Sequence, residues 1–150
     1  MSELTDLYQE ILLDHYRSPR NFGPLEPCDR EVEGHNPLCG DRITLRLRLA
    51  GERIEEARFE GSGCAISTAS ASMMTEAVRG RSVAEALELG ERFRTRLTGS
   101  APVEPEGEEP AEMAALDGVR EFPMRVKCAT LAWHALREAL TGAAGRVSTE

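Results

Sequence analysis

Thr44-Leu45-Arg46-Leu47-Arg48-Leu49 is the stretch that decides the fold, because its leucines alternate strictly with polar residues. Successive side chains of a β-strand point to opposite faces, so this pattern predicts a strand with one buried face. Ala50-Gly51-Glu52 supplies a turn, and the segment from Ile54 to Glu60 returns with apolar residues on one face. Together the two segments predict an antiparallel hairpin.

Both outer ends of this hairpin carry residues that can bind a metal. Asn36-Pro37-Leu38-Cys39-Gly40-Asp41-Arg42 precedes the first strand and sets a thiol and a carboxylate two residues apart in a tight turn. Gly61-Ser62-Gly63-Cys64 follows the second strand and ends at another thiol. An antiparallel hairpin brings the chain back to the edge where it began. Asp41 is therefore expected near the turn that ends at Cys64.

Helical spacing of apolar residues predicts helices on both sides of the hairpin. The first should end before Ser18-Pro19, because proline disfavours helical geometry in the residue ahead of it. A second follows Cys64, and a third opens at the capping box Ser82-Val83-Ala84-Glu85. The last follows Phe122-Pro123, and the small polar tail from Thr141 is expected to fray.

Shorter elements are expected between these segments. Arg30 to Glu33 is consistent with a short strand, and Glu112 to Gly118 with a short helix. His134 lies beside the apolar stripe of the last helix and is predicted to be exposed. Cys28 lies in a loop with no partner at ligand spacing, so it is interpreted as a spectator thiol.

Cys64 and Cys128 are both predicted to lie at helix N-termini, with Cys128 in the first turn of the last helix. The helix dipole and the unpaired backbone amides at such an end favour negative charge, which lowers a thiol's pKa. The alternative is that these cysteines are small buried apolar residues. Cysteines set in Gly-rich turns or helix starts favour the chemical interpretation.

Cys39, Asp41, Cys64 and Cys128 together would complete a tetrahedral shell for a borderline-soft cation. A zinc site with a closed shell is normally structural, although the carboxylate is the weaker partner and could be exchanged. The same thiolates could hold an iron–sulfur cluster, and spacing alone does not decide between the two. Disulfides are disfavoured because the chain is expected in a reducing compartment.

Composition indicates an ordinary globular protein whose 150 residues fit one domain, 1–150. The net charge of −8 argues against nucleic acid or an anionic membrane as the main partner. Part of that charge lies in a proline-rich acidic segment, 99–110, which is predicted to be a mobile loop. No apolar run approaches the length of a membrane span, and the N-terminal residues lack a basic signal region, so a cytoplasmic location is expected.

Taken together, the motifs resemble those of the U-type iron–sulfur cluster assembly proteins, the IscU, NifU N-terminal and SufU group. The resemblance covers nearly the whole chain and is highly specific. Its pieces are Asp14-His15-Tyr16-Arg17-Ser18-Pro19-Arg20-Asn21, Asn36-Pro37-Leu38-Cys39-Gly40-Asp41, Gly61-Ser62-Gly63-Cys64-Ala65-Ile66-Ser67, Ala69-Ser70-Ala71-Ser72-Met73-Met74 and Arg125-Val126-Lys127-Cys128-Ala129-Thr130-Leu131-Ala132-Trp133.

The resemblance implies an α+β fold in which a small three-stranded antiparallel sheet is covered on one face by helices. It also implies a metal site formed by Cys39, Asp41, Cys64 and Cys128. In the classical scaffolds a histidine precedes the last cysteine, behind a Leu-Pro-Pro-Val-Lys chaperone-recognition stretch. Here Lys127 takes that place, Phe122 to Val126 replace the stretch, and extra sequence precedes the last helix. These departures resemble the SufU branch, in which the protein binds zinc and relays sulfur.

The leading hypothesis is a zinc-dependent sulfurtransferase that accepts persulfide sulfur from a cysteine desulfurase for iron–sulfur cluster biogenesis. Cys39 is the expected acceptor, because its Pro- and Gly-flanked turn is predicted to be the most mobile of the three cysteine sites. One alternative is a non-enzymatic, iron-binding scaffold that assembles a [2Fe-2S] cluster on the same three cysteines and one aspartate and passes it to apo-proteins. The expected partners are the cysteine desulfurase and the downstream iron–sulfur assembly machinery. Another is a small zinc-stabilised interaction module that never carries sulfur.

Overall fold

The computed structural model describes residues 3–37, 39–99, 111–142 and 146–148. Its elements, in chain order, are α1 (Glu3–Arg17), β1 (Arg30–Asn36), β2 (Asp41–Ala50), β3 (Arg53–Ser62), α2 (Ala65–Val78), α3 (Val83–Thr98), the 3₁₀ helix η1 (Ala111–Glu121), α4 (Pro123–Thr141) and β4 (Arg146–Ser148). Except for Gly99, the acidic segment predicted to be a mobile loop lies outside the described residues.

Three antiparallel strands form the body of the sheet, whose strand order is β3-β2-β1-β4. The predicted hairpin of β2 and β3 is confirmed, with its turn between Ala50 and Arg53. Burial alternates along β2, so the leucines of the deciding stretch face the core. The short strand β4 pairs in parallel with β1, so the expectation that the whole tail frays is wrong for residues 146–148.

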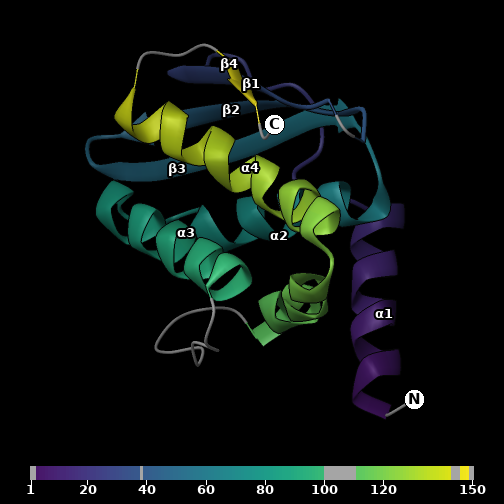
Figure 1. Cartoon of the computed structure of the whole chain (residues 1–150). Helices are drawn as coiled ribbons and strands as arrows, with labels where there is room; N and C mark the ends of the chain where they lie inside the picture. Colours follow the sequence, from purple (N-terminus) through teal and green to yellow (C-terminus); the bar gives the residue numbers. More distant parts are fainter. Residues whose placement is uncertain (1–2, 38, 100–110, 143–145, 149–150) are drawn as a thin grey trace.

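The helices cover one face of this sheet, as the predicted α+β fold requires. Figure 1 shows α2, α3 and α4 on the same side of the strands, with α1 standing beside α2. Buried side chains of the sheet and of the helices meet in a single core, which includes Leu45, Leu47, Phe59, Met74, Phe93, Leu131 and Leu136. No helix in the described part of the chain combines the length and apolarity needed to cross a bilayer.

Gly34 lets α4 approach the sheet closely. A Cβ atom at this position in β1 would lie 2.8 Å from Ile43 Cγ2 and 3.1 Å from Leu131 Cδ1. The missing side chain therefore brings the middle of α4 directly onto β1. Cys128 lies one helical turn before Leu131, so the same contact sets its position relative to the ends of the strands.

Small residues also bring α2 against α4. Ser67, Ser70 and Ser72 are buried on α2, and the Ser70 hydroxyl donates a hydrogen bond to the Ala129 carbonyl. Ser72 Oγ lies 2.7 Å from His15 Nδ1 and so ties the end of α1 to α2. The Ser70–Ala129 hydrogen bond fixes α2, whose N-cap is Cys64, relative to the segment of α4 that carries Cys128.

Candidate metal centre

Four parts of the fold meet at one end of the sheet. Asn36 ends β1 and Asp41 begins β2, and these two residues pair with each other in the sheet. The turn between them carries Cys39. Arg42 pairs with Ser62 at the end of β3, which leads directly to Cys64 at the start of α2. The hairpin thus brings distant residues together as predicted, and α4 adds Cys128.

Cys39, Asp41 and Cys128 form a compact group in which the potential ligand atoms all lie within 4.8 Å of one another. The Cys39 and Cys128 sulfur atoms are 3.3 Å apart. Zinc–sulfur bonds of about 2.3 Å imply a ligand–ligand separation of roughly 3.8 Å in a tetrahedral site. Two thiols and a carboxylate at these separations fit a zinc ion in both size and donor chemistry. Asp41 and Cys128 are buried whereas Cys39 is exposed, so the group has a closed side and an open side.

Cys64 borders this group but is not a member of it. It is the N-cap residue of α2, where its sulfur accepts a hydrogen bond from the Ser67 amide at 3.4 Å. Its own backbone amide donates to Asp41 Oδ1 at 3.0 Å. The prediction that Cys64 lies at a helix N-terminus is therefore confirmed. The thiol is bonded to its own helix, and its backbone orients the carboxylate.

The predicted helix-start position of Cys128 is wrong. Because Pro123 occupies the first turn of α4, Cys128 falls in the second turn, beyond the unpaired amides of the helix start. Burial raises the pKa of the Cys128 thiol well above its ordinary value, with further contributions from Asp41, Cys39 and Cys64. Without a cation this thiol is protonated near neutral pH, so metal binding there must release a proton.

Asn36 is a residue of the site to which the sequence analysis gave no role. It is fully buried, and its amide nitrogen donates to Asp41 Oδ2 at 3.3 Å and to Cys128 Sγ at 3.5 Å. Its buried side-chain oxygen has no hydrogen-bond partner among the described residues. A buried amide that spans two potential ligands fixes their spacing. The signal for this role in the sequence was the position of Asn36, directly before Pro37 and three residues before Cys39.

Gly63 packs directly against the Asp41 carboxylate because it has no side chain. A Cβ atom at this position would lie 2.7 Å from Asp41 Oδ1 and 3.2 Å from Asp41 Cγ. Asn36 holds one oxygen of the carboxylate and the Cys64 amide holds the other. The carboxylate therefore cannot move away from a side chain added at position 63 without losing these hydrogen bonds. Glycine is therefore required here for close packing against a potential ligand.

The sequence pattern of the NifU-like N terminal domain matches residues 7–129, which is most of the chain and includes every residue of this site. The chain belongs to the NifU-like N-terminal domain family. The recognised resemblance to U-type assembly proteins is thus confirmed. Cys28, the remaining cysteine of this NifU-like domain, is half-buried and is not part of the compact group.

Two curated relatives cover most of this NifU-like domain. The chain is 43% identical over 137 residues to the zinc-dependent sulfurtransferase SufU of Bacillus subtilis, covering 91% of both chains. It is 44% identical over 140 residues to the iron-sulfur cluster assembly scaffold protein IscU of Streptococcus pyogenes, covering 93% of this chain and 86% of the relative. The crystal structure of the N-terminal part of a NifU-like protein from Brucella abortus superposes with a TM-score of 0.80 at 25% identity, covering 93% of this chain and 95% of that one.

Replacing Asn36 with Ala should weaken zinc binding by this NifU-like domain by about tenfold or more, because Asp41 and Cys128 lose their shared donor. Competition with a chelator would measure the affinity. Asn21→Ala is the control, since the Asn21 amide bonds Thr75 rather than a potential ligand. It should lower the melting temperature without changing zinc affinity. Unchanged affinity in the Asn36 variant would contradict the positioning role.

Replacing Gly63 with Ala should also weaken zinc binding, by roughly tenfold, because the added methyl group displaces the Asp41 carboxylate. Gly118→Ala adds the same methyl group where no atom lies within 4 Å, so it should bind zinc as the unchanged protein does. Both variants are compared by zinc titration against a fluorescent chelator. Equal affinities in the two variants would show that the Asp41 carboxylate is not a ligand.

Proposed function

We propose that this NifU-like domain is a zinc-dependent sulfur-transfer protein that accepts persulfide sulfur from a cysteine desulfurase. The observation that carries the proposal is the asymmetry of the site. One exposed thiol, Cys39, lies 3.3 Å from a buried thiol, Cys128, beside a buried carboxylate. An exposed sulfur can meet a partner's persulfide, whereas the buried groups can only hold the site together. The similarity to a protein named a zinc-dependent sulfurtransferase supports the same conclusion.

The residues proposed to hold zinc are Cys39, Asp41, Cys64 and Cys128. Three of them already lie at ligand separations, and Cys64 would have to give up the hydrogen bond from the Ser67 amide to join them. A bound zinc ion would keep these thiols deprotonated near neutral pH. Asn36 and the Cys64 amide hold the Asp41 carboxylate in place throughout.

The proposed transfer is a thiol exchange at Cys39. The Cys39 thiolate attacks the terminal sulfur of the desulfurase persulfide, forming a new sulfur–sulfur bond on Cys39. The sulfur–sulfur bond of the donor breaks, and the donor cysteine leaves as a thiolate. The number of disulfide-level bonds is unchanged, so no external oxidant or reductant is needed. The persulfide on Cys39 would then pass to the downstream assembly machinery, in a cytoplasm that keeps the other thiols reduced.

Intact-mass analysis after incubation with a cysteine desulfurase and cysteine tests this proposal. The expected result is the mass of one added sulfur atom, which peptide mapping assigns to Cys39. Treatment with a reductant should remove the added mass, since a persulfide is reducible. Sulfur found on Cys28 or Cys64 instead would contradict the proposed acceptor.

A second candidate is a scaffold that assembles a [2Fe-2S] cluster on the same three thiols and the same carboxylate. The observation in its favour is the 44% identity to a protein named a cluster assembly scaffold. Thiolates are the usual cluster ligands, so the residue set alone permits it. Visible absorption separates the two candidates, because a cluster is coloured and zinc, with its full d shell, is not.

A further inference from the structure

A cavity lies between α3 and α4, lined by residues that the proposed sulfur transfer does not use. Its volume is about 320 Å³, at the lower end of the range for small-molecule sites. The apolar lining comes from both helices and comprises Ala86, Leu87, Trp133 and Leu136. Gly90 widens it, because a Cβ atom there would lie 3.2 Å from Trp133 Cε3.

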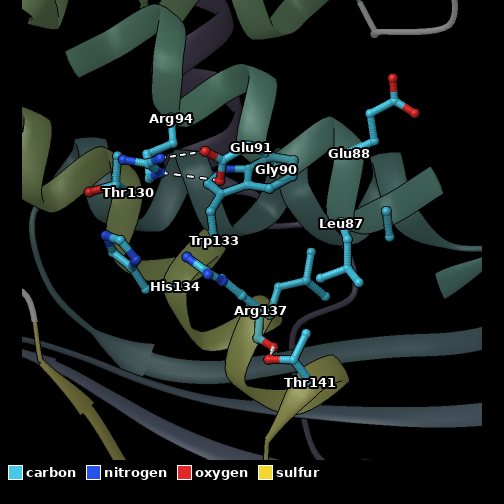
Figure 2. A pocket seen from close by; sticks show the side chains of 12 residues that line it. Leu87, Glu88, Gly90, Glu91, Arg94, Thr130, Trp133, His134, Arg137 and Thr141 are labelled. Carbon is cyan, nitrogen blue, oxygen red and sulfur yellow. Dashed lines mark hydrogen bonds and ion pairs between the residues drawn. The ribbon is translucent and has the colours of Figure 1, made fainter. Parts of the chain in front are cut away.

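Most charges at the mouth of this cavity neutralise one another. Arg94 donates to both carboxylate oxygens of Glu91, as the dashed lines in Figure 2 show. Glu88 lies 3.8 Å from Arg92, and its side chain points away from the cavity in Figure 2. Arg137 is exposed, and among the residues that the structure describes its guanidinium makes no hydrogen bond or ion pair. Within the described chain, the cavity therefore has one guanidinium that is held in no hydrogen bond or ion pair, although it lies near enough to Glu91 to help lower the pKa of that carboxyl.

His134 adds an adaptable polar group beside Arg137. Its side chain was predicted from the sequence to be exposed, but it is half-buried. Burial lowers the pKa of its imidazole, and the neighbouring Arg94 and Arg137 lower it further. A neutral imidazole can either donate or accept a hydrogen bond, so it suits a carboxylate as well as a neutral polar group.

We propose that this cavity binds a small carboxylate with an apolar body, the body against Trp133 and Leu87 and the carboxylate on Arg137. An amine would meet the positive charge of Arg137, which is held in no ion pair among the described residues. A highly charged anion such as a polyphosphate would find, in the described lining, only one cation outside an ion pair and would leave the apolar lining unused. An amphipathic monoanion satisfies both halves, because the guanidinium matches a carboxylate in geometry and charge. The proposal does not depend on the sulfur-transfer function.

Tryptophan fluorescence gives a direct test, because Trp133 is the only tryptophan in the chain. The probe is 4-phenylbutyrate, titrated into the full-length protein. We expect a saturable change in emission with a Kd on the order of 1 mM or lower. The neutral amide of the same compound and phenethylamine should each bind about tenfold more weakly or not at all.

Two substitutions separate the halves of the site. Arg137→Gln should weaken binding of 4-phenylbutyrate about tenfold, whereas Arg17→Gln, the same charge change on exposed α1, should have no effect. Gly90→Leu should abolish binding by filling the cavity, with circular dichroism confirming that the variant is folded. No saturable binding to the unchanged protein would overturn the proposal. Equal binding by the Arg137 variant would overturn the assignment of the carboxylate.

Discussion

Replacing Cys39 with Ala is expected to lower the rate of sulfur acceptance from a cysteine desulfurase at least about a thousandfold, because the attacking atom is lost. Cys39 is the exposed thiol of the site, and its neighbours Asp41 and Cys128 are buried. Among the described residues of the site, Cys39 is the one exposed cysteine, and Cys64 is half-buried with its sulfur bonded to the Ser67 amide. The rate is measured as sulfur bound per chain over time, by trapping persulfides with an alkylating reagent.

The same variant should keep its fold. An exposed side chain in a turn contributes little to the core, so the metal-free melting transition should move by no more than about 0.5 kcal/mol of unfolding free energy. Cys28→Ala is the control, because it removes a half-buried thiol outside the compact group and should accept sulfur normally. Undiminished acceptance in the Cys39 variant would show that another cysteine is the acceptor.

Replacing Cys128 with Ala should abolish stoichiometric zinc binding. Cys128 lies on the buried side of the site, next to Asp41 and Asn36, and among the described residues the compact group contains no other buried thiol. Losing one thiolate from the proposed four-ligand site should weaken zinc binding by at least about a hundredfold. Elemental analysis of the purified variant should then give little zinc, whereas Cys28→Ala should keep about one ion per chain.

Thermal unfolding separates a lost ligand from a damaged fold. Because zinc binds the folded state, chelation should lower the melting temperature of the unchanged protein. The Cys128 variant should melt near the metal-free value whether or not a chelator is present. A variant that still loses stability on chelation would mean that zinc is held without Cys128.

Local patterns were enough to predict the parts of the fold in which each residue's environment is set by its neighbours in sequence. Alternation from Thr44 to Leu49 gave the strand and its buried face, and the Ser82 capping box is present with both of its hydrogen bonds. The strand β4 has only three residues and depends on pairing with β1, so no periodicity could reveal it. Such a strand is stabilised by tertiary contacts rather than by its own sequence.

The ligand set was predictable from residue chemistry, but its environment was not. That Cys39, Asp41 and Cys128 meet follows from the hairpin register and the packing of α4. Cys128 lies in the second turn of α4 and not in the predicted first turn, because Pro123 starts the helix earlier than its apolar stripe indicates. The bridging role of Asn36 requires knowing which way a buried amide points, and that is set by packing in three dimensions.

Anaerobic purification, with metal and sulfide analysis and a visible spectrum on the same sample, is the most direct test of the central claim. We expect about one zinc per chain, no acid-labile sulfide and no visible absorption, because zinc is colourless. A brown protein with stoichiometric iron and sulfide would contradict the sulfur relay. It would identify Cys39, Asp41, Cys64 and Cys128 as the residues around a cluster.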